Sequence, residues 1–195
     1  MMNKDSVRRF FDAMAPGWDA DMVTDSEKLT AILDAAGVGP GSRVLDVACG
    51  TGVLFPWYLR RQAGAVLGVD LSPEMVRIAA GKVTDPRIRV LCADMETLPV
   101  TEVFDCCVVY NAFPHFEDPE RLVSRLALWV RPGGRIAIAH GMGLEALRRH
   151  HAGAAKDVSR EMLSAPALAA LLEPWFAVDT AVSDADKYIV AGTRR

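Results

Sequence analysis

The chain has few cysteines, little net charge and no long apolar run. Its four cysteines in 195 residues are Cys49, Cys92, Cys106 and Cys107. They lack the paired spacing of a zinc site, so we expect free, buried thiols. The formal net charge of −3 gives no electrostatic basis for binding nucleic acid or an anionic membrane. No apolar run approaches the roughly 20 residues that a membrane-spanning helix needs.

The first residues of the printed sequence also lack the apolar segment of a signal peptide. Residues 1–6 read MMNKDS and are polar. We therefore expect a cytoplasmic protein with no nucleic-acid and no membrane partner, either a monomer or a homodimer. Hydrophobic residues make up 51% of the chain and charged residues 24%, which is typical of a globular core with a solvated surface. The length is typical of one domain.

Short apolar segments alternate with helical patterns along the chain. Strands are predicted at 43–47, 65–70, 87–91, 104–110, 135–140, 177–182 and 188–193, and a turn at 131–134. Helices are predicted at 4–14, 26–36, 54–63, 119–130 and 165–172, with another from residue 73 and a short one within 141–151. This alternation predicts an α/β fold: a Rossmann-like, doubly wound sheet of seven strands. We expect it to be mostly parallel with the last strand antiparallel, and to carry helices on both faces.

The segment from Val44 to Gly52 joins a strand to a helix through a small-residue turn. An apolar run ends in Asp46, and Ala48-Cys49-Gly50-Thr51-Gly52 follows. Glycine lets the backbone approach a ligand closely, and open α/β sheets bind nucleotides at such turns. The alternative is an ordinary loop whose glycines serve only the turn.

Three aspartates follow the first three predicted strands. Asp46 ends the first, Asp70 ends the second and Asp94 follows the third. Carboxyl ends of parallel strands share one edge of a sheet, so we expect the three side chains at one ligand-binding edge. Asp70 lies about twenty residues beyond the turn, where a carboxylate accepts hydrogen bonds from ribose hydroxyls. A nicotinamide enzyme would use the same acid, but its G-x-G-x-x-G fingerprint is absent.

Residues 40–140 resemble class I S-adenosylmethionine-dependent methyltransferases, in particular the small-molecule enzymes of quinone biosynthesis. The matching segments are VLDVACGTG at 44–52, GVDLS at 68–72 with Met75, AD at 93–94 with LP at 98–99, FD at 104–105 and LWVRPGG at 128–134. FDAMA at 11–15 and WD at 18–19 resemble the openings of the same enzymes. Ala48 stands where the family often has glycine, and it is small enough to leave the loop close to a ligand. The cofactor implied by the resemblance is S-adenosyl-L-methionine.

The resemblance implies a role for each matching position. The glycine loop would pass beneath the methionine part of the cofactor, with Asp46 orienting it. Asp70 would bind both ribose hydroxyls, and Asp94 would accept from the adenine amino group. Trp18 would close over the cofactor or serve in packing, while Asp12 and Asp105 are expected to be a solvated acid and a strand-start acid. The implied cofactor-binding residues are Trp18, Asp46, Ala48, Cys49, Gly50, Gly52, Asp70, Leu71, Met75, Asp94, Met95 and Asn111.

Residues 1–195 are expected to form a single methyltransferase domain. Within it, 1–36 would be an N-terminal helical lid and 40–140 the cofactor-binding core. Residues 141–175 would supply substrate-side helices, and 176–195 a C-terminal hairpin around the turn at 183–186.

The four histidines are the candidate catalytic residues. His115, His140, His150 and His151 all follow strands four and five, and we expect them on the substrate side. One of them could be a general base, with His115 the first choice. Several could bind a metal or a metal-bearing substrate, although no protein metal site is predicted. Alternatively, some are simply solvated, His150 and His151 above all.

The predicted activity is in-line transfer of a methyl group to a small-molecule acceptor, for which alignment and water exclusion are the main tasks of the protein. A chain of this length leaves little room for a domain that reads a macromolecule. The segment after strand four reads NAFP, not the Asn/Asp-Pro-Pro-aromatic pattern of amino-directed nucleic-acid enzymes. The alternatives are a cofactor-binding regulatory protein without catalysis and an enzyme that methylates a macromolecule. The acceptor atom stays open between carbon, nitrogen, oxygen, sulfur and a metalloid.

Overall fold

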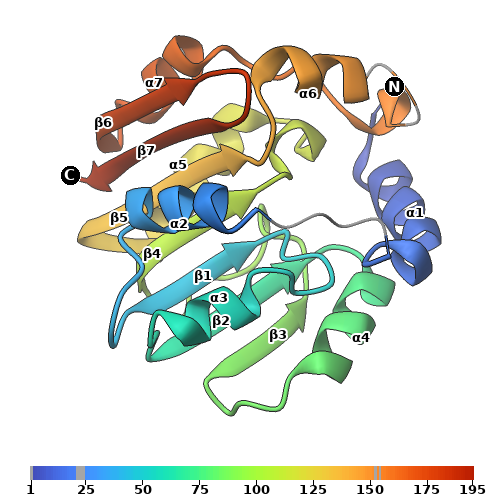
Figure 1. The fold of residues 1–195 in the computed structure, drawn as a ribbon, viewed down its shortest axis with the longest axis horizontal. Coiled ribbons are helices and arrows are strands. Elements are labelled where there is room, and N and C mark those ends of the chain that lie inside the picture. Colours follow the sequence, from blue (N-terminus) through green and yellow to red (C-terminus); the bar gives the residue numbers. More distant parts are fainter. Residues whose placement is uncertain (1, 21–24, 152, 154) are drawn as a thin grey trace.

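A seven-stranded mixed sheet forms the centre of the molecule (Figure 1). The computed structural model describes residues 2–20, 25–151, 153 and 155–195. The strands are β1 (Arg43–Val47), β2 (Ala65–Asp70), β3 (Ile88–Cys92), β4 (Phe104–Tyr110), β5 (Val130–His140), β6 (Phe176–Ser183) and β7 (Tyr188–Arg194). Their order is β3-β2-β1-β4-β5-β7-β6, and β7 runs antiparallel to both of its neighbours. The predicted fold is confirmed.

Helices cover both faces of the sheet because each strand-helix-strand connection crosses over it. The helices are α1 (Lys4–Met14), α2 (Ser26–Ala35), α3 (Phe55–Arg60), α4 (Pro73–Lys82), α5 (Pro119–Trp129), α6 (Leu144–His151) and α7 (Ala165–Leu172), with short 3-10 turns η1 (Ala15–Gly17), η2 (Phe113–His115) and η3 (Lys156–Val158). One core lies under α2 and α3, where Ile32 and Tyr58 are fully buried. The other lies under α5 and α7, where Leu126 and Leu168 are fully buried.

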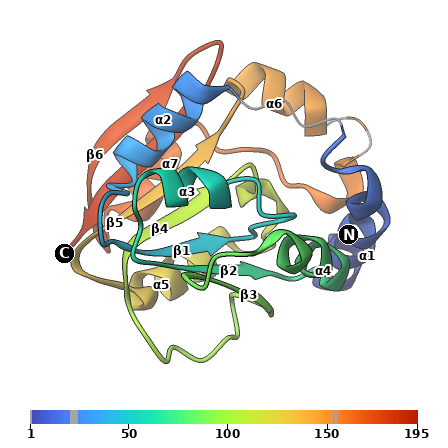
Figure 2. The same ribbon diagram turned by 60° about the horizontal axis from the view of Figure 1, so that its bottom comes forward.

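Two helices lie off the faces of the sheet. In Figures 1 and 2, α1 and α6 lie beyond the ends to which the parallel strands point. Helix α1 contacts α4 and η3, and its buried residue Val7 forms a small apolar cluster with Ala155 and Val158. Helix α1, helix α6 and the turn η3 therefore lie over the carboxyl edge of the sheet, where ligands bind in this architecture.

Two details of the sequence prediction are wrong. The turn predicted at 131–134 belongs to β5, which begins at Val130 and bulges there: Phe104 pairs with Val130, but Cys106 pairs with Arg135. All four cysteines are free, but Cys92 is exposed because it ends β3, the edge strand of the sheet. In the described part of the chain, no helix combines the length and the apolar character needed to cross a membrane.

Candidate active site

A pocket opens at the carboxyl ends of β1 to β4, beneath α1. The empty space there is about 1130 Å³, which includes the solvent-open part of the pocket. The predicted cofactor residues that line it are Trp18, Asp46, Ala48, Cys49, Gly50, Asp70, Leu71, Met75, Asp94, Met95 and Asn111. Gly52 is not among the lining residues. His115 is the one predicted catalytic residue that lines the pocket among those whose side chains the structure describes.

The loop after β1 is held in an unusual backbone conformation. Ala48, Gly50 and Gly52 have φ values of 55°, 54° and 81°, in the left-handed region that favours glycine. A Cβ atom at Gly52 would lie 2.6 Å from the ring of Phe55, so this glycine permits packing of the loop on α3. Ala48 and Gly50 turn toward the pocket instead.

Asp70, at the end of β2, fastens this loop. Its Oδ2 accepts a hydrogen bond of 2.8 Å from the Gly50 amide, and its Oδ1 accepts one of 2.9 Å from the Ser72 amide. Burial raises the pKa of Asp70, and these backbone hydrogen bonds oppose that rise. Each carboxylate oxygen has two acceptor positions, so both oxygens keep capacity for hydroxyl donors from a ligand.

Asp46 is a buried acid beside Asp70. Its side chain lies on the pocket wall, and its Oδ2 has no hydrogen-bond partner among the described residues. Burial raises its pKa to about 8; the charge of Asp70 adds to this rise, and the nearby Tyr58 hydroxyl opposes it. A buried carboxyl group without a counter-charge gains from a neighbouring cation. The position therefore suits a positively charged part of a ligand.

Asp94, after β3, is oriented from two sides. Its Oδ1 accepts from the Glu96 amide at 2.9 Å, and its Oδ2 accepts from Lys4 Nζ at 2.6 Å. Burial alone would raise the pKa of Asp94, but the Lys4 ammonium and the Glu96 amide hold it below the usual value. Lys4 also pairs with the Glu96 carboxylate at 2.7 Å. The acid is thus ionised and fixed at the pocket wall.

Residues of the N-terminal segment make further contacts with the pocket loops. Asp12 accepts a hydrogen bond of 2.6 Å from the Ser72 hydroxyl, so the prediction of a solvated acid is wrong. Asp19 accepts one of 2.6 Å from the Thr51 hydroxyl and pairs with Lys82. Asp105 lies away from the pocket and pairs with Arg131, as a strand-start acid. No local pattern reveals the Lys4, Asp12 and Asp19 contacts, because each joins segments far apart in the sequence.

Aromatic rings connect the N-terminal segment to the loop after β4. Phe11 packs edge-on against Trp18, with ring centroids 5.7 Å apart, and against His115, at 4.9 Å. All three side chains line the pocket. A Cβ atom at Gly50 would lie 4.0 Å from the Trp18 indole nitrogen, so Trp18 lies over the glycine loop.

The His115 ring is held in one orientation. Its Nδ1 lies 2.9 Å from the Val158 carbonyl oxygen and 3.2 Å from the Ser159 hydroxyl. A carbonyl oxygen only accepts, so Nδ1 carries the proton in the neutral ring and Nε2 carries the lone pair. Burial lowers the pKa of His115; the Val158 hydrogen bond opposes this effect and His150 adds to it. The ring is therefore neutral at pH 7.

The structure does not bring His140 or His150 into the pocket. His140 is fully buried in β5, with its ring 6.0 Å from that of Tyr188. His150 is exposed on α6, and the side chain of His151 lies outside the described residues. Among described residues, no group of three or more His, Cys, Asp and Glu side chains could hold a metal ion.

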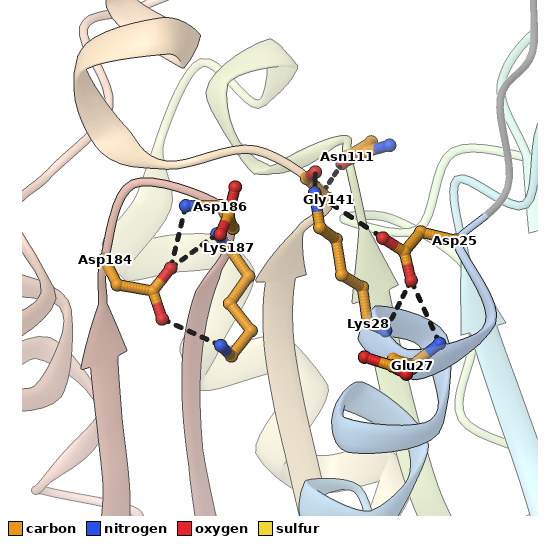
Figure 3. A network of polar contacts seen from close by, with 8 residues as sticks. All are labelled: Asp25, Glu27, Lys28, Asn111, Gly141, Asp184, Asp186 and Lys187. Carbon is orange, nitrogen blue, oxygen red and sulfur yellow. Dashed lines mark hydrogen bonds and ion pairs between the residues drawn. The ribbon is translucent and has the colours of Figure 1, made fainter.

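Asn111 and Tyr110 close the pocket at the end of β4. Asn111 has a φ of 53°, and its Oδ1 accepts from the Gly141 amide at 2.9 Å (Figure 3). Lys28 Nζ lies 3.5 Å from the Gly141 carbonyl oxygen and ties α2 to the same point. Tyr110, which sequence reasoning missed, lines the pocket; a Cβ atom on Gly141 would lie 2.7 Å from its hydroxyl oxygen.

Comparison with known proteins supports the architecture. Residues 45–138 match the family model described as "Methyltransferase domain". The demethylmenaquinone methyltransferase of Renibacterium salmoninarum is 31% identical over 142 residues, which are 69% of this chain and 58% of that protein. The malonyl-[acyl-carrier protein] O-methyltransferase of Priestia megaterium is 24% identical over 140 residues, 70% of this chain and 51% of that protein. The chain thus spans a little over half the length of these two curated relatives.

Solved structures share the fold along the whole chain. The magnesium protoporphyrin IX methyltransferase of Synechocystis PCC 6803, solved with S-adenosylhomocysteine, superposes with a TM-score of 0.75 at 18% identity. The match covers 99% of this chain and 100% of that one. At this identity the likeness concerns the fold alone. The matched domain at residues 45–138 and the related sequences support assignment of the chain to the class I S-adenosylmethionine-dependent methyltransferases.

Proposed function

We propose that the protein binds S-adenosylmethionine in this pocket and transfers its methyl group to a small-molecule acceptor. The observation that carries the proposal is the set of three acids, Asp46, Asp70 and Asp94, which line one pocket from the ends of β1, β2 and β3. Asp46 lies where a cationic methionyl group would offset its burial. Asp70 keeps acceptor capacity for two ribose hydroxyls, and Asp94 for the adenine amino group.

The other proposed cofactor contacts follow from the same placement. The backbone of Ala48, Cys49 and Gly50 would lie beneath the methionyl part. Apolar lining suits the adenine ring, and the proposed lining residues there are Leu71, Met75 and Met95. Trp18 would cover the cofactor from the lid, and Asn111 would face its methionyl end. Gly52 is proposed to shape the loop through its packing on Phe55.

His115 is the proposed general base for an acceptor that must lose a proton. When bound, the cofactor supplies an electrophilic methyl group on a sulfonium. His115 Nε2 would accept the proton that the acceptor loses on methylation, and the cofactor would be left as a neutral thioether. The Val158 carbonyl holds the ring in the required tautomer and stabilises the protonated form. Because its pKa is lowered, His115 is a weak base suited to acidic hydroxyl or carbon donors.

Two observations support a small-molecule acceptor. The N-terminal segment covers the pocket, and several related proteins are methyltransferases of small molecules. These include methyltransferases of demethylmenaquinone and of ubiquinone biosynthesis. The malonyl-[acyl-carrier protein] relative favours a second candidate, an acceptor presented on a carrier protein. We also propose that the protein works in the cytoplasm. A regulatory protein that binds the cofactor without catalysis stays the alternative.

Calorimetry with S-adenosylmethionine and S-adenosylhomocysteine tests the cofactor assignment. We expect both to bind, and Asp70→Ala to weaken binding sharply because the acid holds both the loop and the ribose. Asp186→Ala is the matched control, since Asp186 is exposed in the turn between β6 and β7. Equal affinity of the Asp70→Ala variant and the wild type would refute the ribose assignment.

Transfer of a radiolabelled methyl group tests the acceptor class. The protein is incubated with labelled S-adenosylmethionine and a cell extract separated by size. We expect label in the small-molecule fraction. Label in protein or nucleic acid would favour a macromolecular acceptor, and cofactor binding with no transfer in any fraction would favour the regulatory alternative.

A further inference from the structure

The N-terminal segment is attached to the loops after β1, β2 and β3, which carry most of the proposed cofactor contacts. Asp19 holds Thr51 after β1, and Asp12 holds Ser72 after β2. Lys4, in the first turn of α1, holds the loop after β3. Because the N-terminal segment contacts three loops, a shift of any of these loops would also shift this segment. The Lys4 attachment differs from the others because it involves a proposed ligand-binding acid directly.

Lys4 bridges two carboxylates at the pocket wall. Its Nζ lies 2.6 Å from Asp94 Oδ2 and 2.7 Å from Glu96 Oε2. The Glu96 side chain is only 3% exposed, whereas that of Lys4 is 37% exposed. All three residues line the pocket. Without the ammonium, two neighbouring carboxylates would face each other in a largely dry place, which is unfavourable.

Helix stability does not explain a lysine at this position. The amino-terminal end of a helix carries a partial positive charge, so a cation in the first turn is disfavoured. Asn3 already caps α1, with its side chain accepting from the Ser6 amide. The ion pairs of the Lys4 ammonium with Asp94 and Glu96 therefore explain a lysine at this position.

Lys4 also decides how Asp94 faces the pocket. The Glu96 amide holds Oδ1 and Lys4 holds Oδ2, so both oxygens are oriented while each keeps one further acceptor position. The same helix carries Phe11, which packs on His115 across the pocket. One rigid element thus connects the proposed adenine end with the proposed acceptor end.

We propose that Lys4 is a positioning residue for the cofactor: it orients Asp94 toward the adenine amino group and couples closure of α1 to cofactor binding. The inference rests on the proposed function.

Calorimetry with S-adenosylhomocysteine and 5′-methylthioadenosine tests the positioning. The second probe has the adenosine part without the amino-acid part. We expect Lys4→Met to weaken both by a similar factor of roughly ten, equivalent to about 1.4 kcal/mol. Lys4→Arg should retain most of the affinity. Arg9→Met is the control, because Arg9 is an exposed cation on the same helix.

A second substitution separates positioning from simple loss of stability. Glu96→Gln removes the like charge beside Asp94, so the double variant Lys4→Met/Glu96→Gln should recover part of the lost affinity. In hydrogen exchange, S-adenosylhomocysteine should protect residues 4–14 strongly in the wild type and in Lys4→Arg, and weakly in Lys4→Met. Thermal melts of each variant verify that it is folded.

The outcomes separate the inference from the proposed function. If the wild type binds neither probe, the proposed function fails and the inference fails with it. If the wild type binds and Lys4→Met binds equally well, only the inference is overturned. Loss of affinity without any recovery in the double variant would also overturn it.

Discussion

The Gly50 amide donates a 2.8 Å hydrogen bond to Asp70 Oδ2 and so joins the loop after β1 to the end of β2. Gly50 has a φ of 54°, and its backbone conformation directs this N–H toward the acid. The Ser72 amide holds the other oxygen. One carboxylate therefore shapes the wall of the pocket and also offers acceptors to a ligand.

Asp70→Asn should reveal this double role. The asparagine side chain keeps one acceptor oxygen. Its NH2 group, however, would face the backbone N–H of either Gly50 or Ser72, so two donors would oppose each other. We expect S-adenosylhomocysteine affinity to fall by about 30-fold to 150-fold, equivalent to about 2–3 kcal/mol. Calorimetry on Asp70→Asn beside Asp186→Asn measures it. A loss of less than about threefold would contradict the role of Asp70.

Binding of S-adenosylmethionine should release a proton from Asp46. Its pKa of about 8 means that the carboxyl group is mostly protonated at pH 7 in the free protein. A cationic ligand favours the ionised form, so affinity should rise with pH until about 8. Calorimetry at pH 7 in buffers of different ionisation enthalpy should detect up to one proton released. Asp46→Asn should abolish that component, and equal release by both proteins would rule Asp46 out as its source.

Ala48→Gly should stabilise the protein. Ala48 has a φ of 55°, a conformation that costs a residue with a Cβ atom roughly 1 kcal/mol and costs glycine much less. We expect the melting temperature to rise by about 2–4 °C. Ala80→Gly on the exposed side of α4 is the control, and it should lower stability by about 1 kcal/mol. A lower melting temperature for Ala48→Gly would show that the methyl group makes a compensating contact.

His115→Asn should impair transfer and leave cofactor binding intact. The Asn side-chain NH2 group can still donate to the Val158 carbonyl, but it cannot accept a proton. For an acceptor that must be deprotonated, we expect a loss of about 10²-fold to 10⁴-fold in kcat. In the wild type the rate should fall on the acid side of pH 6.5, because only neutral imidazole is a base and the pKa of His115 is lowered. An unchanged pH profile in the variant would exclude His115 as the base.

The sequence was sufficient to predict the sheet and the edge at which the three acids meet. That success has a physical basis, since parallel strands with crossover helices leave few topologies and place strand ends together. The packing of His140 could not be foreseen, because it depends on the register that sets this residue opposite Tyr188 on β7. Nor could the bulge in β5, which depends on how Val130 and Arg135 pair with β4.

The contacts of Lys4 and Asp12 were beyond sequence reasoning for a different reason. Their partners, Asp94 and Ser72, lie 90 and 60 residues away in the chain. Helical periodicity indicates which side of α1 is apolar, but it does not indicate which other segments of the chain this helix contacts. Only the packed arrangement connects the N-terminal segment to the loops.

The location of Met2 and Asn3 on the pocket wall has a practical consequence for handling the protein. Met2 and Asn3 belong to the pocket wall, and helix α1, which follows them, lies at the opposite side of the molecule from the C-terminus (Figure 1). A purification tag fused ahead of Met2 would begin beside the pocket wall, and we expect it to lower the affinities measured there. The same tag placed after Arg195 would leave the entrance clear.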